Sequence, residues 1–241
     1  MNITDSISAW GREMPEAPAL ITDKSSLSFA ELDRAVSMTA AGFAKAGLEP
    51  GQSVGIHLTD QAQHLIASLA LARLGAGQIA FDVKDPPRLQ TAFRGKLGIV
   101  AAVAKPSTPI GTGLSRLEPP PADLEHFKGL GKVDFKGADD QDLPFLFLNT
   151  SGTASGVPKI GLLTHILAHH HFKTLGPDLP VGPGMRALSL SSINFTGAKK
   201  NIYRFLISGG CFALMDEPAG PEELVEFVEA HGIGYIYGTL V

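Results

Sequence analysis

The sequence is poor in cysteine, in tryptophan and in charged residues. Its 241 residues include one cysteine, Cys211, one tryptophan and 18% charged side chains. A single cysteine excludes a fold that is held together by disulfide bonds within the chain. The formal net charge is −4, which excludes a general nucleic-acid-binding surface because such a surface is basic. An anionic ligand would therefore be bound by local donors rather than by the charge of the whole protein.

Long apolar runs and targeting signals are also lacking. No run approaches the roughly 20 apolar residues that a membrane-spanning helix needs. Residues 1–16 contain no basic segment followed by an apolar stretch, so no secretory signal is predicted. Hydrophobic residues make up 44% of the chain, which is typical of a globular protein with a substantial core. We expect a cytoplasmic protein with no membrane span.

The first hundred residues alternate between amphipathic helices and short apolar strands. Ser28 and Glu31 have the spacing of a capping box at a helix N-terminus, and Asp60 and Gly75 mark the start and the end of the next helix. Strands that are apolar throughout and separated by helices indicate a parallel sheet that is covered on both faces. Helices are predicted at 27–51, 60–75 and within 86–96, and strands at 53–58, 77–83 and 98–104.

Residues 105–142 interrupt this alternation. They are rich in proline, glycine and charge, and we interpret them as a long irregular connection between two α/β halves. The predicted fold class is α/β, with three layers in which mostly parallel sheets carry helices on both faces. The predicted segments are a first α/β subdomain at 1–104, the connection at 105–142, and a second α/β segment at 143–241 that begins with the phosphate loop and is truncated at its C-terminus. Within the last segment, strands are predicted at 143–148, 185–191, 211–215 and 233–238, and helices at about 164–175, 197–208 and 221–231.

The stretch NTSGTASGVPKIGLLTH, residues 149–165, carries the clearest chemical signal. Backbone N–H groups and helix N-termini bind phosphate where the chain can come close to it. Gly152 and Gly156 permit that approach, Pro158 restricts the backbone, and Lys159 supplies a positive charge. The pattern predicts a phosphate-binding loop between a strand and a helix. The alternative is a surface turn that happens to be rich in serine and threonine.

Two familiar loops do not fit this stretch. A Walker A loop has its lysine directly after the second glycine, whereas Val157 and Pro158 intervene here. A nucleophile elbow has the pattern G-x-S-x-G, whereas residues 152–156 have the pattern G-x-x-S-G. The order of the residues assigns no acid–histidine pair to a nucleophile in this loop.

The loop resembles that of the adenylate-forming superfamily, which comprises acyl- and aryl-CoA synthetases, the adenylation domains of nonribosomal peptide synthetases, and luciferases. The superfamily pattern is roughly T-S-G-[ST]-[TS]-G-x-P-K-G, followed a few residues later by Thr-His, as in Thr164 and His165. This chain has one additional residue before Gly156, and Ile160 replaces the usual glycine. The residues that match the pattern are Thr150, Ser151, Gly152, Thr153, Gly156, Pro158 and Lys159.

The resemblance extends along nearly the whole chain. Residues 27–58 are similar to the opening helix and strand of the superfamily, and residues 73–87 are similar to its K-A-G-A-x-Y-x-P-x-D segment. Many members later carry P-x-x-H-x-x-G, and here Asn194 takes the histidine position while Gly197 matches. The resemblance implies that Asn194, Phe195 and Gly197 lie at the acyl pocket. The alternative is an ordinary strand-to-helix turn.

The resemblance implies an AMP-forming ligase. Such an enzyme activates a carboxylic acid with ATP, gives acyl-AMP and pyrophosphate, and passes the acyl group to the thiol of CoA or of a carrier protein. An acyl-CoA synthetase of this kind would act in fatty acid metabolism. The catalytic lysine and the Mg²⁺ ligand of the superfamily are expected beyond Val241, so this chain alone is expected to be inactive. The residues expected to contact the ATP phosphates are Thr150, Ser151, Gly152, Thr153, Ser155, Gly156 and Lys159.

Other reactive side chains are interpreted as structural. Successive residues of a helix point about 100° apart, so the run His169–His171 cannot converge on one ion and is expected on a solvated helix face. His57 and His64 have no acid–base partner by spacing, and Cys211 lies in an apolar strand. No metal site is predicted.

Two other functions remain open from the sequence. A non-catalytic α/β module would keep the loop for a phosphorylated ligand or partner, and the sequence downstream of Val241 discriminates this function from a ligase. A serine hydrolase would pair a serine with Lys159, as amidases do, and would react with a fluorophosphonate probe.

Overall fold

A computed structural model describes residues 1–82, 87–149, 160–174, 180–215 and 220–238. The chain folds into two compact units, and each unit is assembled from separate stretches of sequence. The predicted segments 1–104, 105–142 and 143–241 are contiguous, whereas the units are not. Unit 1 comprises Met1–Ile3, Val36–Pro120 and Val133–His171, and unit 2 comprises Thr4–Ala35, Pro121–Lys132 and Phe172–Val241.

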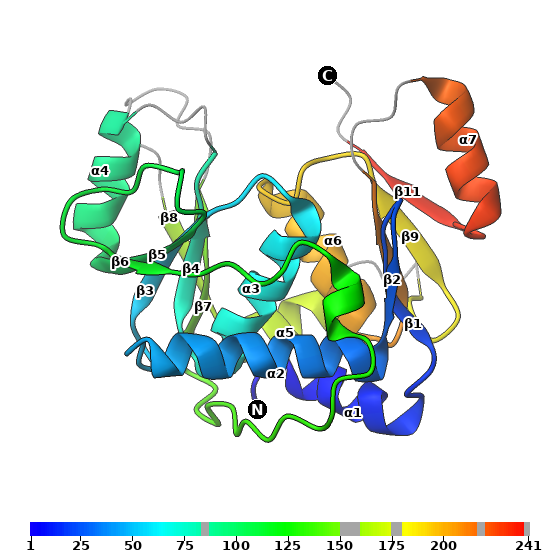
Figure 1. Ribbon diagram of the computed structural model, residues 1–241, viewed down its shortest axis with the longest axis horizontal. Coiled ribbons are helices and arrows are strands. Elements are labelled where there is room, and N and C mark those ends of the chain that lie inside the picture. The colour runs from blue at the N-terminus through cyan, green and yellow to red at the C-terminus, as the bar shows by residue number, and fades with distance from the viewer. Residues whose placement is uncertain (83–86, 150–159, 175–179, 216–219, 239–241) are drawn as a thin grey trace. The chain divides into compact units, whose positions relative to one another are not determined.

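Unit 1 contains a six-stranded sheet with the strand order β6-β5-β3-β4-β7-β8 (Figure 1). Neighbouring strands are parallel except for β8, which runs antiparallel to β7. The stretch 105–142, predicted to be irregular, supplies β6, so that prediction is wrong at this point. The strands are β3 (Ser53–His57), β4 (Gly77–Ala80), β5 (Ile99–Ala104), β6 (Ser115–Leu117), β7 (Pro144–Asn149) and β8 (Ile160–Thr164).

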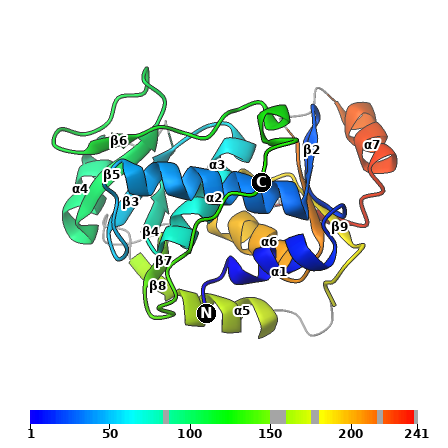
Figure 2. The same cartoon turned by 60° about the horizontal axis from the view of Figure 1, so that its bottom comes forward.

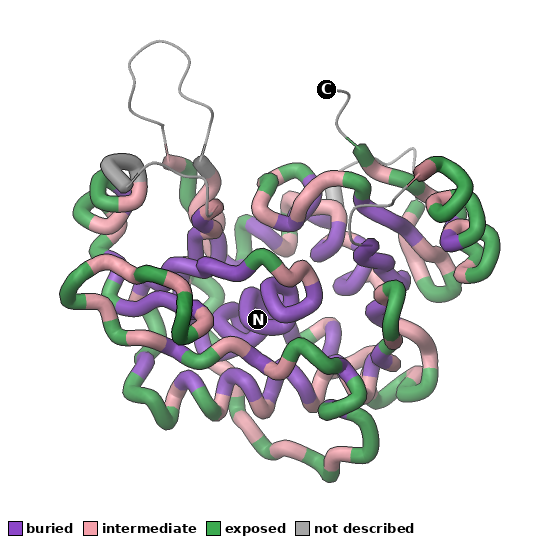
Figure 3. Tube along the Cα trace, turned by 45° about the horizontal axis from the view of Figure 1, so that its top comes forward, coloured by how far each residue is buried: buried purple, intermediate pink, exposed green. Residues whose placement is uncertain are grey.

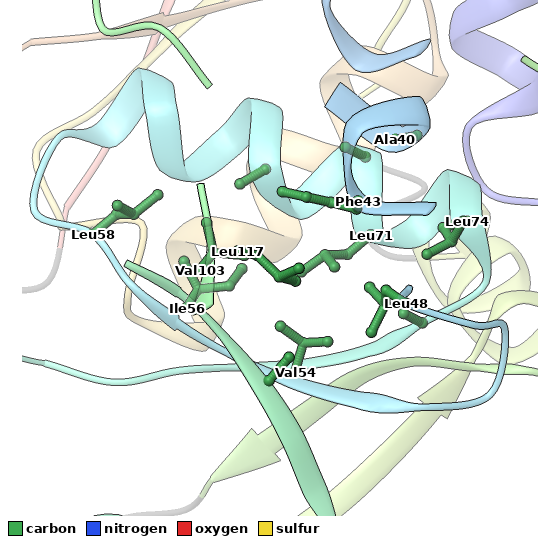
Figure 4. Close-up of a cluster of buried hydrophobic side chains, with 14 residues drawn as sticks. Ala40, Phe43, Leu48, Val54, Ile56, Leu58, Leu71, Leu74, Val103 and Leu117 are labelled. Carbon is green, nitrogen blue, oxygen red and sulfur yellow. The ribbon is translucent and has the colours of Figure 1, made fainter. Parts of the chain in front are cut away.

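Helices cover both faces of this sheet, as the apolar strands predict. On one face, α3 (Gln61–Leu74) and the end of α2 (Phe29–Lys45) pack Leu71 and Phe43 against Val54 and Ile56 of β3 (Figure 4). On the other face, α4 (Pro87–Leu97) packs Phe93 against the neighbouring strands. Side chains of a strand alternate between its two faces; β3 contributes Val54 and Ile56 to the first cluster, and β4 contributes Ile79 to the second.

Helix α3 is buried along its length (Figure 3). A helix that is apolar on all sides is expected in a core rather than at a surface. Both predicted ends are confirmed. The Asp60 carboxylate accepts a hydrogen bond from the Gln63 N–H at 2.8 Å, and Gly75 ends the helix with a left-handed φ of 86°.

Unit 2 contains a five-stranded sheet with the order β11-β9-β10-β1-β2. Its neighbouring strands are parallel except for the pair β1 and β2. Its first helix α1 lies beside α6 (Figure 2), and the Trp10 indole donates to the Ile207 carbonyl at 3.0 Å. The elements are α1 (Asp5–Glu13), β1 (Pro18–Ile21), β2 (Ser26–Ser28), η1 (Leu124–Phe127), β9 (Arg186–Ser189), α6 (Thr196–Ile207), β10 (Cys211–Leu214), α7 (Pro221–Ala230) and β11 (Tyr235–Tyr237).

The start of the predicted helix 27–51 shows how a strand and a helix compete for the same residues. Ser26–Ser28 pair with β1, so the helix begins only at Phe29. The predicted capping box is confirmed at this boundary. The Ser28 N–H donates to the Glu31 carboxylate at 2.8 Å, and the Glu31 N–H donates to the Ser28 hydroxyl at 3.3 Å.

The two sheets are mainly parallel and carry flanking helices, so the predicted fold class is confirmed. Helix α5 (His165–Thr174), like α2, contributes residues to both units. Among the helices that the structure describes, none combines the length and the apolar character that crossing a membrane requires.

Candidate functional site

The carboxyl ends of β3, β4, β5 and β7 meet at one edge of the six-stranded sheet because these strands are parallel. Ligands of open α/β sheets bind at this edge. Strand β7 ends at Asn149, and Asn149 pairs with Ile160 at the start of β8. Both ends of the predicted phosphate loop are therefore anchored side by side at this carboxyl edge. The predicted phosphate contacts Thr150, Ser151, Gly152, Thr153, Ser155, Gly156 and Lys159 lie outside the described residues.

The helix predicted at about 164–175 is confirmed as α5, but it is separated from the predicted loop by a strand that was not predicted. Strand β8 intervenes, and α5 begins only at His165. A five-residue strand spans roughly 17 Å at about 3.4 Å per residue, so the N-terminus of α5 starts at the opposite end of β8 from the loop. We expected the N-terminus of this helix to help bind the phosphate, and that expectation is wrong. The predicted phosphate contacts that remain are the backbone N–H groups, the hydroxyls and Lys159.

His57 is the last residue of β3 and therefore lies at the same carboxyl edge. It is buried, and its ring lies against Phe81 with 4.8 Å between the ring centroids. Burial, together with the nearby guanidinium groups of Arg116 and Arg94, lowers the pKa of His57 to about 4. The imidazole is therefore neutral at neutral pH, which fits a structural role.

Arg116 and Arg94 organise the connection that follows β5. The Arg116 guanidinium donates to the carbonyl of Lys105 and, at 2.9 Å, to that of Thr108. The Arg94 guanidinium donates to the Thr112 carbonyl. Sequence reasoning did not single out either arginine, because a side chain that binds loop carbonyls leaves no motif. Both add positive charge near the edge from which the predicted phosphate loop departs.

The predicted acyl-pocket residues lie in unit 2, with Asn194 and Phe195 in the turn between β9 and α6 and Gly197 in the first turn of α6. The Asn194 side-chain oxygen is buried and has no hydrogen-bond partner among the described residues. Phe195 precedes the first turn of α6 and exposes 62% of its surface, and no side chain would crowd a Cβ at Gly197. An exposed phenyl ring can contact a ligand, whereas the buried Asn194 oxygen is not accessible to one. The acyl pocket stays a prediction, and an ordinary strand-to-helix turn stays its alternative.

Unit 2 also contains buried polar groups that the sequence analysis missed. Lys199 on α6 is 2% exposed, and burial lowers the pKa of its ammonium group to about 7. The Tyr237 hydroxyl is buried without a hydrogen-bond partner in the described part of the chain, and burial raises the pKa of Tyr237. Neither position shows a signal in the sequence, because Lys199 continues an amphipathic helix and Tyr237 continues an apolar strand.

The remaining reactive residues have the environments expected of structural groups. Cys211 is buried, and burial raises the pKa of its thiol to about 12, which makes it a poor nucleophile. His64 is fully buried in α3, whereas His170 is exposed on α5. Across the described ranges, no three His, Cys, Asp or Glu residues are grouped so that they could hold a metal ion. The predicted Mg²⁺ ligand beyond Val241 stays a prediction.

Comparison with known sequences assigns the chain to a family. The profile of the family described as AMP-binding enzyme matches residues 7–240. Phenyloxazoline synthase of Mycolicibacterium paratuberculosis is 26% identical over 231 residues, which are 92% of this chain and 19% of the relative. AM-toxin synthetase of Alternaria alternata is 27% identical over 212 residues, which are 86% of this chain and 5% of the relative. The chain thus spans less than a fifth of these relatives.

Solved structures share the same fold. The NpsA N-terminal subdomain of Klebsiella oxytoca, in complex with 3-hydroxybenzoyl-AMSN, matches with a TM-score of 0.79 and 22% identity over 98% of this chain and 59% of that chain. VinN matches with a TM-score of 0.82 and 14% identity over 98% of this chain and 63% of that chain.

The family profile covers almost the entire chain and the fold agrees with it. The protein therefore belongs to the AMP-binding enzyme family, and it has the fold of the N-terminal subdomain of an adenylate-forming enzyme.

Proposed function

We propose that the chain forms the ATP-binding part of an AMP-forming ligase that activates a carboxylic acid. A carboxylate oxygen of the acid attacks the α-phosphorus of ATP, the bond from that phosphorus to the bridging oxygen of pyrophosphate breaks, and acyl-AMP and pyrophosphate form. The observation that carries this proposal is the family match over residues 7–240. The anchoring of both loop ends at the carboxyl edge of the sheet supports it. The non-catalytic alternative has no comparable support.

The loop would act on the departing pyrophosphate. Negative charge builds on pyrophosphate in the transition state, and fixed donors around it lower the barrier. Thr150, Ser151, Thr153 and Lys159 would supply these donors. Mg²⁺ would add charge neutralisation when bound, and its ligand is expected beyond Val241.

We propose a carrier-protein thiol as the acceptor. The thiolate sulfur attacks the acyl carbon of acyl-AMP, a thioester forms, and AMP leaves. Nonribosomal peptide synthetases are among the relatives, and one solved neighbour is an adenylation–PCP di-domain. CoA as the acceptor and a role in fatty acid metabolism, which the resemblance also implied, have no support among these relatives.

Lys159→Ala tests the phosphate role of the loop. It removes one charge-assisted contact, which is worth roughly 1.5 to 3 kcal/mol, or about tenfold to over a hundredfold in kcat/KM for ATP. The measurement is acid-dependent exchange of labelled pyrophosphate into ATP, made on the longest reading frame that contains residues 1–241. Transfer from preformed acyl-AMP involves no pyrophosphate and should change far less.

Lys159→Arg is the matched control. It keeps the charge but replaces a compact ammonium group with a planar fork, so it should restore activity only in part. Equal losses in both half-reactions of Lys159→Ala would refute the phosphate role. Labelling of the wild-type chain by a fluorophosphonate probe would instead favour the serine hydrolase.

Phe195→Ala tests the proposed acyl pocket at Asn194, Phe195 and Gly197. Removing an exposed phenyl ring that contacts the acid should raise the KM for the acid by about tenfold, because burying a phenyl side chain is worth roughly 1.5 to 3 kcal/mol. The KM for ATP should change little. Val225→Ala is the control, since Val225 on α7 is also an exposed apolar residue, at 53%. Equal effects of the two substitutions would contradict the pocket.

A further inference from the structure

Strand β8 is held on one side only. It is the edge strand of its sheet and, in the part of the chain that the structure describes, it pairs only with β7. None of its five residues is fully buried, and Ile160 alone among them packs against the cluster around Phe93. The register of a strand that contains glycine and lacks a fully buried face is weakly specified. The register of β8 therefore depends on how its two ends are fixed, and one of these ends continues from the predicted phosphate loop.

The other end of β8 is fixed by His165, which directly follows the strand. The side chain is fully buried, and its Nδ1 accepts a hydrogen bond from the Ile3 backbone N–H at 3.2 Å. Its ring lies against Phe145 of β7, with 5.4 Å between the ring centroids. An accepting Nδ1 carries no proton, so the imidazole is neutral. Burial lowers the pKa of His165 to about 4, which keeps it neutral at neutral pH.

The segment that donates to His165 is itself anchored within unit 1. Asn2 is buried, and its side-chain amide donates to the Ala72 carbonyl at 2.7 Å and to the Ala138 carbonyl at 3.2 Å. The His165 N–H also donates to the carbonyl of Leu143, the residue before β7, at 3.4 Å. His165 thus joins the start of α5, the first residues of β7 and a fixed N-terminal segment at one point.

We propose that His165 is a positioning residue that fixes the register of the β7–β8 hairpin, whose other end lies at the carboxyl edge of the sheet. A slip of one residue turns every side chain of a strand to the other face. The consequence for ATP binding rests on the proposed function, whereas the statement about the register does not.

A pair of cysteines can report the register without ATP. Leu148 pairs with Gly161, and a Cβ at Gly161 would lie 3.9 Å from the Leu148 Cβ. Disulfides need a Cβ–Cβ distance of about 3.5 to 4.5 Å, so Leu148→Cys with Gly161→Cys should form one in the native register. A slip of one residue places the two thiols on opposite faces. The natural cysteine, Cys211, is buried and belongs to unit 2.

The experiment measures disulfide formation by this pair in a glutathione buffer, in the 241-residue chain. His165→Phe keeps a ring against Phe145 but leaves the Ile3 N–H without its acceptor, and we expect cross-linking to fall by about fivefold or more. His165→Asn is the matched control, because its side-chain oxygen takes the place of Nδ1. It should cross-link like the parent pair.

Cross-linking of the His165→Phe chain at the parent level would overturn the proposal. Equal losses in His165→Phe and His165→Asn would also overturn it, because ring packing would then set the register. If His165→Phe does not fold, Asn2→Ala is the second variant. It removes the hydrogen bonds that anchor the segment donating to His165, so it should also lower cross-linking. In the protein expressed from the longest reading frame that contains residues 1–241, His165→Phe should raise the KM for ATP about tenfold or more, and His165→Asn should not. If the His165 variants change cross-linking as expected but Lys159→Ala does not change kcat/KM for ATP, the proposed function is refuted and the proposal about the register stands.

Discussion

Replacing Gly75 by alanine is expected to destabilise unit 1 strongly. Gly75 ends α3 in the left-handed conformation, with a φ of 86°. Its N–H donates to the Ala72 carbonyl at 3.0 Å, and the Ala76 N–H donates to the Leu71 carbonyl at 2.9 Å. These two bonds satisfy carbonyls that the helix end would otherwise leave open. The left-handed residue is therefore required for the chain to turn from α3 into β4.

Two costs combine in the alanine variant. A residue with a Cβ loses about 1 to 2 kcal/mol in the left-handed region. The new Cβ would also lie 2.7 Å from the Ala138 Cβ and 2.7 Å from the Leu143 Cδ1. Relieving such an overlap in a packed core costs typically about 1 to 3 kcal/mol. The expected loss is about 2 to 5 kcal/mol, a large share of the roughly 5 to 15 kcal/mol that stabilise a domain.

Urea unfolding followed by circular dichroism measures this loss as a lower midpoint at unchanged slope. Gly42→Ala is the matched control. Gly42 lies within α2, and a Cβ there would meet no atom within 4 Å, so alanine should stabilise the protein by about 0.5 to 1 kcal/mol. A Gly75→Ala protein within about 0.5 kcal/mol of the parent would refute the reasoning, since that is the range of a neutral surface substitution.

Two further outcomes follow from the described contacts. Asp60→Ala removes the acceptor for the Gln63 N–H at the start of α3 and should cost about 1 kcal/mol in urea unfolding, while Asp60→Asn keeps a side-chain oxygen and should cost less. The pKa of His57 falls from 6.5 to about 4 on folding, so the unfolded chain binds the proton first as the pH falls. Stability should therefore be lost between pH 6.5 and 4, by on the order of 3 kcal/mol. His57→Asn should reduce this loss, and an unchanged pH dependence of the unfolding free energy would contradict a neutral buried imidazole.

The sequence predicted the elements whose ends carry their own signals. The helix between Asp60 and Gly75 and the capping box at Ser28 were found because the capping groups lie next to the helices that they end. Strands β1 and β2 were missed because they are short and owe their conformation to distant partners, as Leu20 does to Phe212. Strand β8 was missed because its five residues were counted with the predicted loop, and a short apolar run does not identify its own structure.

In the candidate site, too, local motifs could be recognised in the sequence, whereas contacts between distant residues could not. The phosphate loop is predicted from its motif and stays a prediction because its residues lie outside the described ranges; the strand that follows it was not predicted. The contact between Ile3 and His165 joins residues 162 positions apart, and no local pattern signals such a contact. Arg116 likewise acts through carbonyls that the fold brings to it.

The pairing of β1 with β10 has a consequence for synthesis of the chain. Leu20 of β1 lies beside Phe212 of β10, so β1 leaves the ribosome roughly 190 residues before its partner. At about 5 to 20 residues per second, β1 and β2 wait on the order of 10 to 40 s for the centre of their sheet. The last strand of the six-stranded sheet ends at Thr164, and His165 follows it directly, so this sheet can close first. During translation, we therefore expect the apolar residues of β1 to lack the partner that covers them in the finished sheet, which is the condition under which chaperones bind and chains aggregate.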